Sequence, residues 1–175
     1  MWKIGCEKGV MKSLEDVIVD KICDLTNYML SKIIKPDICV ENVREINSKM
    51  IHTLKEQYGI EGVILDVDET IRKDLNKIPS FNKKWIESLK GELKVIIVTN
   101  GSDKDVEDFF RARDIDYIGF AHKPLKKNFK KACEKMNLPP DKVLVVGDRV
   151  FDDIYGGKRN NMKTALVKSV EEDER

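Results

Sequence analysis

The segment Asp66-Val67-Asp68-Glu69-Thr70 places two carboxylates two residues apart, directly after a short apolar run. Two adjacent carboxylates repel each other by about 4 kcal/mol at a separation of roughly 4 Å and an effective dielectric of about 20. Either a divalent cation with oxygen ligands, such as Mg²⁺, or protonation of one carboxyl as a general acid would relieve this repulsion. An isolated pair of this kind is equally typical of the start of a helix, so its chemistry depends on other residues.

Three further segments contain residues of the types that bind phosphate or metal. Thr99-Asn100-Gly101 follows a second apolar run, Lys123 lies further along, and Gly147-Asp148 follows a later run, with Asp152 and Asp153 close behind. Each feature alone is commonly structural. Because the carboxyl ends of parallel strands meet at the edge where open α/β sheets bind ligands, we expect these residues to form one composite site.

Short β-branched runs alternate with amphipathic stretches of helical length from about residue 60. The predicted strands are Val63 to Val67, Lys94 to Val98, Tyr117 to Ile118, Val143 to Val146 and Thr164 to Val167. The predicted helices include Trp85 to Leu89, Val106 to Phe110, Leu125 to Met136 and Ile154 to Asn160. Continuous apolar strands separated by helices are typical of a parallel sheet buried on both faces. The sequence predicts a doubly wound, Rossmann-like α/β domain with five parallel strands and helices on both faces.

Two helices are predicted ahead of this domain. Apolar residues recur at helical spacing from Ser13 to about Ile34, and a second pattern runs from Asn42 to a stop at Gly59. We expect three segments: an N-terminal helical extension packed on the core over residues 1–60, the core over 61–168, and a flexible acidic tail over 169–175.

The composition excludes several classes of protein. The chain has 32 Lys and Arg against 31 Asp and Glu, a net charge of +1, so no long-range attraction for nucleic acid is expected. Its apolar runs are far shorter than the roughly 18 residues of a membrane span, and the N-terminus lacks a secretory signal, which predicts a cytoplasmic protein. The four cysteines form no C-x-x-C pair, which argues against a zinc site and a disulfide framework.

The four polar segments, taken in order, resemble the signature of the haloacid dehalogenase (HAD) superfamily. The matching segments are Asp66 to Thr70, Thr99, Lys123 and Gly147 to Asp153. The resemblance spans about Glu61 to Val167. The stretch His122-Lys123-Pro124-Leu125 and the later Gly156-Gly157 look most like the cap-less branch that contains the YqeG-like phosphatidylglycerophosphate phosphatases.

The resemblance implies a role for each matching residue. Asp66 would be the nucleophile that accepts the phosphoryl group, and Asp68 would protonate the leaving alcohol and later deprotonate water. The residues implied to be catalytic are Asp66, Asp68, Thr99 and Lys123; those implied to bind the phosphate are Asp66, Thr99, Asn100 and Lys123. The implied Mg²⁺ ligands are the Asp66 carboxylate, the Asp68 carbonyl and the Asp148 carboxylate. Thr70 and Asp153 would support these groups by hydrogen bonds, with Asp152 the weaker candidate.

The spacing of the segments bears on the substrate. Asp66 and Thr99 are 33 residues apart and Thr99 and Lys123 are 24 apart, which leaves no room for a large cap domain. The segment Arg72 to Ser80 supplies only a small flap, so we expect an open site. An open site suits a bulky substrate such as a lipid, and it equally suits a homo-oligomer that covers its own site.

The best single expectation for the substrate is phosphatidylglycerophosphate, whose lipid headgroup would bring the protein to a membrane surface as a peripheral contact. The alternative is a small sugar, nucleotide or metabolite phosphate. Five lysines between Lys126 and Lys135 are consistent with a solvated helix face or with attraction of anionic substrates. A phospho-accepting signalling module or a scaffold is an alternative of another class. Receiver domains carry their acidic pair ahead of the acceptor, whereas Asp68 follows Asp66.

Overall fold

The computed structural model describes residues 32–73, 76–168 and 170, together with residues 21, 25, 28 and 29. Most of the helix predicted from Ser13 to Ile34 and nearly all of the predicted acidic tail lie outside these residues. Within the described part, no helix combines the length and the apolar composition that crossing a bilayer requires.

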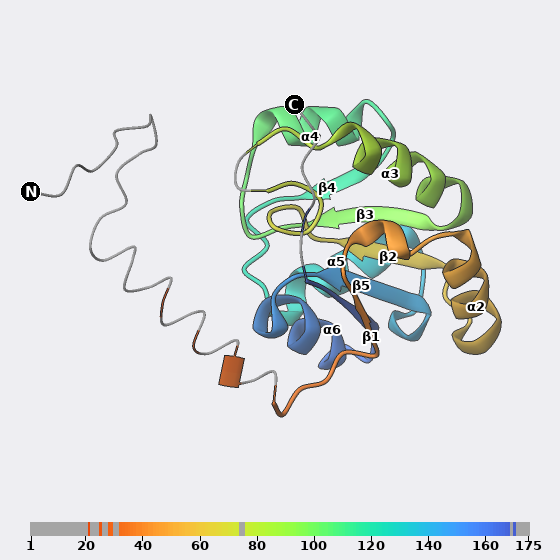
Figure 1. Ribbon diagram of the computed structural model, residues 1–175, viewed down its shortest axis with the longest axis vertical. Helices are drawn as coiled ribbons and strands as arrows, with labels where there is room; N and C mark the ends of the chain where they lie inside the picture. The colour runs from red at the N-terminus through yellow and green to blue at the C-terminus, as the bar shows by residue number, and fades with distance from the viewer. Residues whose placement is uncertain are drawn as a thin grey trace, which may run out of the picture.

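Six parallel strands form a single sheet at the centre of the structure (Figure 1). The strands are β1 (Ile38–Val40), β2 (Gly62–Leu65), β3 (Lys94–Val98), β4 (Asp116–Ile118), β5 (Val143–Gly147) and β6 (Lys163–Val167). Their order in the sheet is β1-β6-β5-β2-β3-β4. The chain winds outward from β2 through β3 and β4, then crosses back to β5 and winds outward in the other direction. The doubly wound parallel sheet is therefore confirmed.

The predicted count of five strands is wrong, because β1 is a sixth strand. Its three residues pair in parallel with residues 165–167 at the outer side of β6. Asp37, just before β1, accepts hydrogen bonds at Oδ2 from the backbone N and the Oγ1 of Thr164, each at 2.9 Å. A three-residue edge strand has no measurable hydrophobic period, so its place is decided by these contacts rather than by its own pattern.

Replacing Asp37 with alanine should lower the free energy of unfolding by about 1–3 kcal/mol, because the Thr164 groups lose their acceptor. Burial alone would raise the pKa of Asp37, but hydrogen bonds from Lys158 and Thr164 outweigh it and lower the pKa. The stabilisation is therefore present at neutral pH and is lost as the pH falls through the lowered pKa. Urea unfolding across this pH range measures the effect; Glu61→Ala, which removes an exposed pair with Lys142, is the control and should change stability little.

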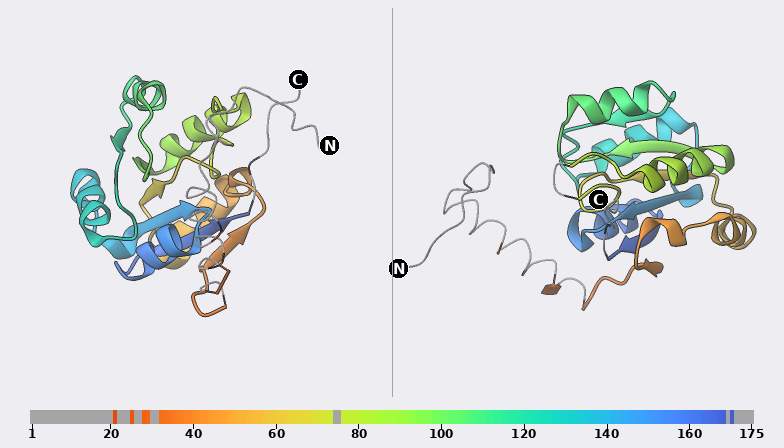
Figure 2. Two further views of the ribbon diagram at one scale, coloured as in Figure 1. Left: turned by 90° about the vertical axis from the view of Figure 1, so that its left-hand side faces the viewer. Right: turned by 45° about the horizontal axis from the view of Figure 1, so that its top comes forward.

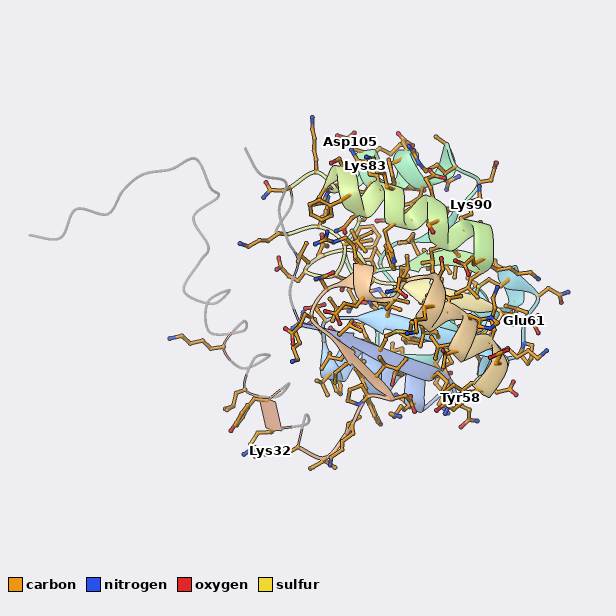
Figure 3. All side chains as sticks on the ribbon, turned by 45° about the vertical axis from the view of Figure 1, so that its right-hand side comes forward. Lys32, Tyr58, Glu61, Lys83, Lys90 and Asp105 are labelled. Carbon is orange, nitrogen blue, oxygen red and sulfur yellow. The ribbon has the colours of Figure 1, made fainter. Side chains whose placement is uncertain are left out.

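The helices lie on both faces of the sheet (Figures 1 and 2). They are η1 (Val43–Glu45), α2 (Ser48–Tyr58), α3 (Ser80–Glu92), α4 (Lys104–Arg111), α5 (Lys126–Met136), η2 (Pro140–Lys142), the π-helical η3 (Val150–Tyr155) and α6 (Gly156–Lys158). Neighbouring strand residues point to opposite faces: Val63 and Leu65 pack in one core with α2, α3 and α4, whereas Ile64 packs in the other with α5. Charged side chains such as Lys90 lie at the surface (Figure 3).

The helix predicted from Asn42 to Gly59 begins later than expected. Asn42 caps only the short η1, where its side chain accepts from the Arg44 N. Asn47 caps α2, because its Oδ1 accepts from two backbone N–H groups at 3.1 and 3.2 Å. The stop at Gly59 is confirmed. The Trp85 indole donates to the Ile46 carbonyl at 3.0 Å and ties the segment between η1 and α2 to α3.

The sheet brings the polar segments to one edge. Asp66, Thr99 and Asp148 follow the carboxyl ends of β2, β3 and β5, which are neighbours in the sheet. The strand order reverses between β2 and β5, the position at which open α/β sheets bind their ligands. Among the described residues, the connections on either side of β3 contain only α3 and α4, so no large cap covers this edge.

Candidate active site

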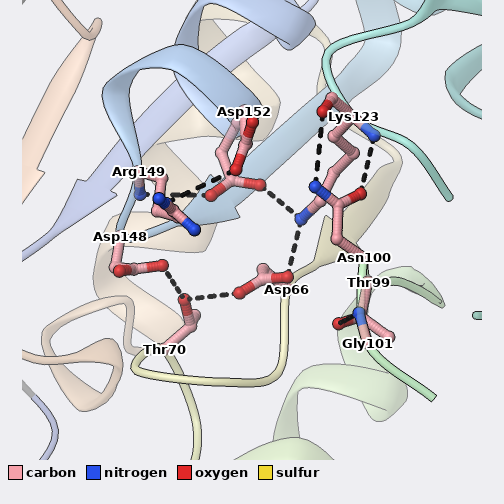
Figure 4. Close-up of polar contacts among 10 residues, drawn as sticks. Asp66, Thr70, Thr99, Asn100, Gly101, Lys123, Asp148, Arg149 and Asp152 are labelled. Carbon is pink, nitrogen blue, oxygen red and sulfur yellow. Dashed lines mark hydrogen bonds and ion pairs between the residues drawn. The ribbon is translucent and has the colours of Figure 1, made fainter. Parts of the chain in front are cut away.

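The carboxylate of Asp66 is bound on two sides (Figure 4). The Nζ of Lys123 donates to Oδ1 at 2.6 Å, and the Oγ1 of Thr70 donates to Oδ2 at 3.3 Å. Thr70 also lies 3.4 Å from Oδ1 of Asp148. One oxygen of Asp66 therefore contacts a cation, and the other contacts a hydroxyl that also lies near a second carboxylate. The four side chains form one connected group, in which Asp66, Thr70 and Lys123 are buried and Asp148 is partly exposed.

Lys123 is held from both its backbone and its ammonium group. Asn100 accepts from the Lys123 N at 2.6 Å and donates to the Lys123 carbonyl at 3.3 Å, and the peptide bond to Pro124 is cis. Burial alone would lower the pKa of Lys123, but Asp153 and Asp66 outweigh it and raise the pKa, so the ammonium stays charged. An ammonium has three N–H donors, and described carboxylates take two of them. The third is available to a phosphate oxygen.

Three carboxylates form an acidic cluster beside Lys123. Oxygen atoms of Asp66, Asp148 and Asp153 all lie within 4.8 Å of one another. Burial raises the pKa of Asp148 to about 8, and the charges of Asp153 and Asp66 add to the rise. When all three carboxylates are ionised, a single lysine cannot balance them, and a hard divalent cation with oxygen ligands would supply the missing positive charge. The donor set therefore fits Mg²⁺.

Asp152 and Asp153 are adjacent in sequence but face different surroundings. Asp153 is buried, with Oδ1 at 2.6 Å from Lys123 and Oδ2 accepting from the Arg149 N at 3.2 Å. Asp152 is partly exposed, and its Oδ2 lies 3.4 Å from Nε of Arg149. A Cβ on Gly147 would overlap the Asp153 carboxylate, so the chain needs glycine where β5 ends. The structure thus brings Asp153 into direct contact with Lys123 and close enough to be a metal ligand, whereas the sequence interpretation gave it only a supporting hydrogen bond.

Two other expected site residues have contacts that narrow their roles. The Asn100 side chain is occupied by the backbone of Lys123, so any contact with phosphate would come from the Asn100 backbone. The buried Thr99 hydroxyl accepts from the Gly101 N at 3.3 Å and keeps its own proton for a phosphate oxygen.

The carboxylate of Asp68 lies outside the three-acid cluster. Its Oδ1 accepts from Nε of Arg72 at 2.7 Å. Because the Asp68 carboxylate is not one of the three whose oxygens lie within 4.8 Å of one another, a metal held by that cluster would contact Asp68 through the backbone carbonyl. Arg72 is buried, and the sequence interpretation treated it only as the first residue of a small flap. The sequence contains only a weak signal for the role of Arg72, namely one charged residue directly after the apolar Ile71. The burial of Arg72 depends on residues far along the chain, such as Asp103.

Comparisons with known proteins agree with this geometry. A family model described as HAD-hydrolase-like matches residues 120–174. The chain is 34% identical over 141 residues to "Probable phosphatase YqeG" of Bacillus subtilis, and this match covers 79% of this chain and 80% of that protein. It is 32% identical over 103 residues to the glyceraldehyde 3-phosphate phosphatase of Pyrococcus furiosus, covering 54% of this chain but only 43% of that protein.

A solved structure shares the fold. The crystal structure of an uncharacterized protein from Listeria monocytogenes superposes with a TM-score of 0.52 at 19% identity, covering 66% of this chain and 84% of that one. The sheet order and the acidic cluster are thus accompanied by a sequence match over 141 residues. On these grounds, the chain belongs to the HAD-like hydrolase family.

Proposed function

We propose that the protein is a Mg²⁺-dependent phosphatase that hydrolyses phosphate monoesters through an aspartyl-phosphate on Asp66. The observation that carries this proposal is the contact of the Asp66 carboxylate with the charged Lys123 inside a buried cluster of acids. A nucleophile and a phosphate-binding cation are thereby held side by side. Similarity to proteins named as phosphatases supports the same reaction class.

The reaction proceeds in two displacements. An oxygen of Asp66 attacks phosphorus, the bond between phosphorus and the ester oxygen breaks, and Asp68 gives its proton to the leaving alcohol. Asp68 then takes a proton from water, which attacks the phosphoenzyme and releases inorganic phosphate and the Asp66 carboxylate. The Oδ1 atom, which faces Lys123, is the oxygen placed for attack.

The remaining residues bind the phosphate and balance its charge. The third N–H of Lys123 and the hydroxyl of Thr99 donate to phosphate oxygens. Mg²⁺ held by Asp66, Asp148 and the Asp68 carbonyl, with Asp153 beside it, would offset the repulsion between the phosphate and the acids.

Addition of Mg²⁺ should raise the melting temperature of the wild-type protein, because an ion that binds only the folded state stabilises it. The gain is about 2.7 kcal/mol when the ion is present at roughly 100 times its Kd. Asp148→Asn should lose most of this shift, since it removes a carboxylate from the cluster. Asp141→Asn, at the opposite end of β5, is the matched control and should keep it. Equal shifts in wild type and Asp148→Asn would contradict the assigned site.

For the substrate, we propose phosphatidylglycerophosphate, whose glycerol phosphate headgroup lies at a membrane surface. Exposed apolar side chains lie close to site residues in the sequence: Phe120 (66% exposed) and Leu125 (58%) stand before and after Lys123, and Phe151 (38%) precedes Asp152. Exposed lysines follow Leu125 on α5, namely Lys126, Lys127, Lys130 and Lys131. Apolar side chains beside lysines suit an anionic lipid surface.

A small metabolite phosphate is the second candidate. It is favoured by the 32% identity to a glyceraldehyde 3-phosphate phosphatase. The two candidates differ in the role of the exposed apolar side chains. A lipid substrate would bring them into contact with a membrane surface, whereas hydrolysis of a small soluble ester would not require them.

Phosphate release should be measured from phosphatidylglycerophosphate in anionic vesicles, glyceraldehyde 3-phosphate, glycerol 3-phosphate and p-nitrophenyl phosphate, with and without Mg²⁺. The lipid proposal expects the highest kcat/KM on vesicles and a selective loss there in Phe120→Ser and Leu125→Ser. Tyr58→Ser is the control, since Tyr58 is also exposed (47%) but lies at the other end of the sheet (Figure 3). Turnover of glyceraldehyde 3-phosphate alone would favour the second candidate. No release from any ester would overturn the phosphatase proposal and favour a signalling or scaffold role.

A further inference from the structure

We propose that Arg72 is a positioning residue that holds the Asp68 carboxylate in the orientation for proton transfer, and that Asp103 holds Arg72 in turn. The inference rests on the proposed function, because Asp68 acts as the proton donor only in that reaction. It adds two residues, from different segments of the chain, to those that the reaction requires.

Arg72 joins two carboxylates through different nitrogen atoms. Its Nε donates to Oδ1 of Asp68 at 2.7 Å, and its Nη1 donates to Oδ2 of Asp103 at 2.6 Å. The Arg72 side chain is 3% exposed, whereas the two acids are 36% and 30% exposed. A planar guanidinium bound at two positions cannot rotate without breaking one of the bonds. Arg72 is thus the fixed, buried centre of the three groups.

The backbone of Arg72 is equally well fixed. Its N donates to the Val67 carbonyl at 3.2 Å, and its carbonyl accepts from the Glu69 N at 2.8 Å. The neighbouring Ile71 carbonyl accepts from Nδ2 of Asn82 at 2.9 Å, which ties this turn to α3. The turn that carries the nucleophile and the proton donor therefore also carries the group that orients the donor.

Asp103 is fixed from the other side by α4. Its Oδ1 caps this helix, accepting from the Asp105 N at 3.0 Å and the Val106 N at 3.3 Å, which leaves Oδ2 for Arg72. The hydrogen bond from Arg72 is the largest cause that lowers the pKa of the Asp103 carboxyl, so Asp103 stays ionised. Arg72 is therefore held to a helix whose position does not depend on Asp68.

These contacts leave one oxygen of Asp68 for the reaction. Oδ1 is bound to Arg72, while Oδ2 lies against Gly101, where an added Cβ would be 3.0 Å away. Among the described residues, none donates a hydrogen bond to Oδ2. Oδ2 is thus the oxygen that carries the proton. Without Arg72, the partly exposed Asp68 side chain can rotate toward solvent, and misplacing a reacting group by about 1 Å costs roughly 100-fold in rate.

The test compares esters that differ in how much they need a proton donor. An alkyl phosphate leaves as a strongly basic alkoxide and needs the proton, whereas p-nitrophenyl phosphate leaves as a stable phenolate. Arg72→Gln should lower kcat/KM, which reports on the steps up to departure of the alcohol and not on the later attack of water, by roughly 100-fold on the best alkyl ester of the panel and by only a few-fold on p-nitrophenyl phosphate. On the alkyl ester the loss should lie in kcat, with KM nearly unchanged. Arg72→Lys keeps the positive charge but lacks the planar set of donors of a guanidinium. Its activity on the alkyl ester should therefore lie between those of the wild type and Arg72→Gln.

Asp103→Asn provides an independent test that spares the fold. Asparagine caps helices as well as aspartate does, so α4 keeps its cap while Arg72 loses a charged partner. This variant should show the same preference for p-nitrophenyl phosphate, to a smaller degree. Arg111→Gln, which removes an exposed pair with Glu107 on the same helix, is the control and should behave like wild type.

A double variant decides whether Arg72 acts through Asp68. In the Asp68→Asn background, Arg72→Gln should cause no further loss on the alkyl ester, because the group that it orients is already gone. Equal losses on both esters, additive effects in the double variant, or a large rise in KM would overturn the inference and make Arg72 a general structural or substrate-binding residue. Failure of the wild type on every ester would instead be a failure of the proposed function.

Discussion

Replacing Asp66 with asparagine should reduce phosphate release by more than about 10⁴-fold on every ester, because an amide cannot form the phosphoenzyme. Intact-protein mass spectrometry after rapid quenching should show a phosphoryl adduct on the wild type and none on this variant. The fold should survive, since Lys123 keeps Asp153 as a partner at 2.6 Å and the acid cluster loses one charge.

The matched control for this change is Asp141→Asn. Asp141 is an exposed aspartate just before β5, at the amino edge of the sheet, whereas Asp66 lies at the carboxyl edge. We expect Asp141→Asn to retain wild-type turnover and adduct formation. Retention of activity within tenfold in Asp66→Asn would refute the assignment of the nucleophile.

The second large effect is expected for Lys123→Met, which should affect both activity and stability. The variant removes the cation that contacts Asp66 and Asp153, each at 2.6 Å. Breaking a buried ion pair by removing one partner costs about 3–5 kcal/mol, because the other charge stays buried. Turnover should fall by at least about 10³-fold, since the phosphate also loses its positively charged partner. Urea unfolding without added metal and steady-state kinetics measure the two losses separately.

The stability loss should depend on pH in a defined direction. Burial raises the pKa of Asp153 in the folded protein, and the loss of Lys123, whose charge lowers that pKa, raises it further above its value in the unfolded chain. The folded state then binds more protons, so the free energy of unfolding rises as the pH falls, more steeply than in the wild type. Lys135→Met removes an exposed pair with Asp116 and should cost less than about 1 kcal/mol at any of these pH values. A loss of the same size in both variants would contradict the buried role of Lys123.

Buried strands could be predicted from the sequence because each of their faces packs against a core. Residues 63–65 and 143–146 are entirely buried, so their apolar runs are continuous, and the parallel doubly wound sheet follows from them. The edge strand β1 could not be predicted in this way, because its place comes from pairing with β6 and from the bonds of Asp37. Nor could the start of α2: Asn42 and Asn47 are both suitable caps, and the backbone geometry decides between them.

The sequence by itself determined the residue types at the ends of the strands, and with them the chemistry that the protein can perform: carboxylates, a hydroxyl and a lysine suited to phosphate and a divalent cation. Only the tertiary structure decided which of these groups meet. It buries Asp153 against Lys123 while Asp152 stays partly exposed, and it places Arg72 between Asp68 and the distant Asp103. The reason is physical: residue type and local period are properties of a segment, whereas burial and charge pairing arise between segments far apart in the chain.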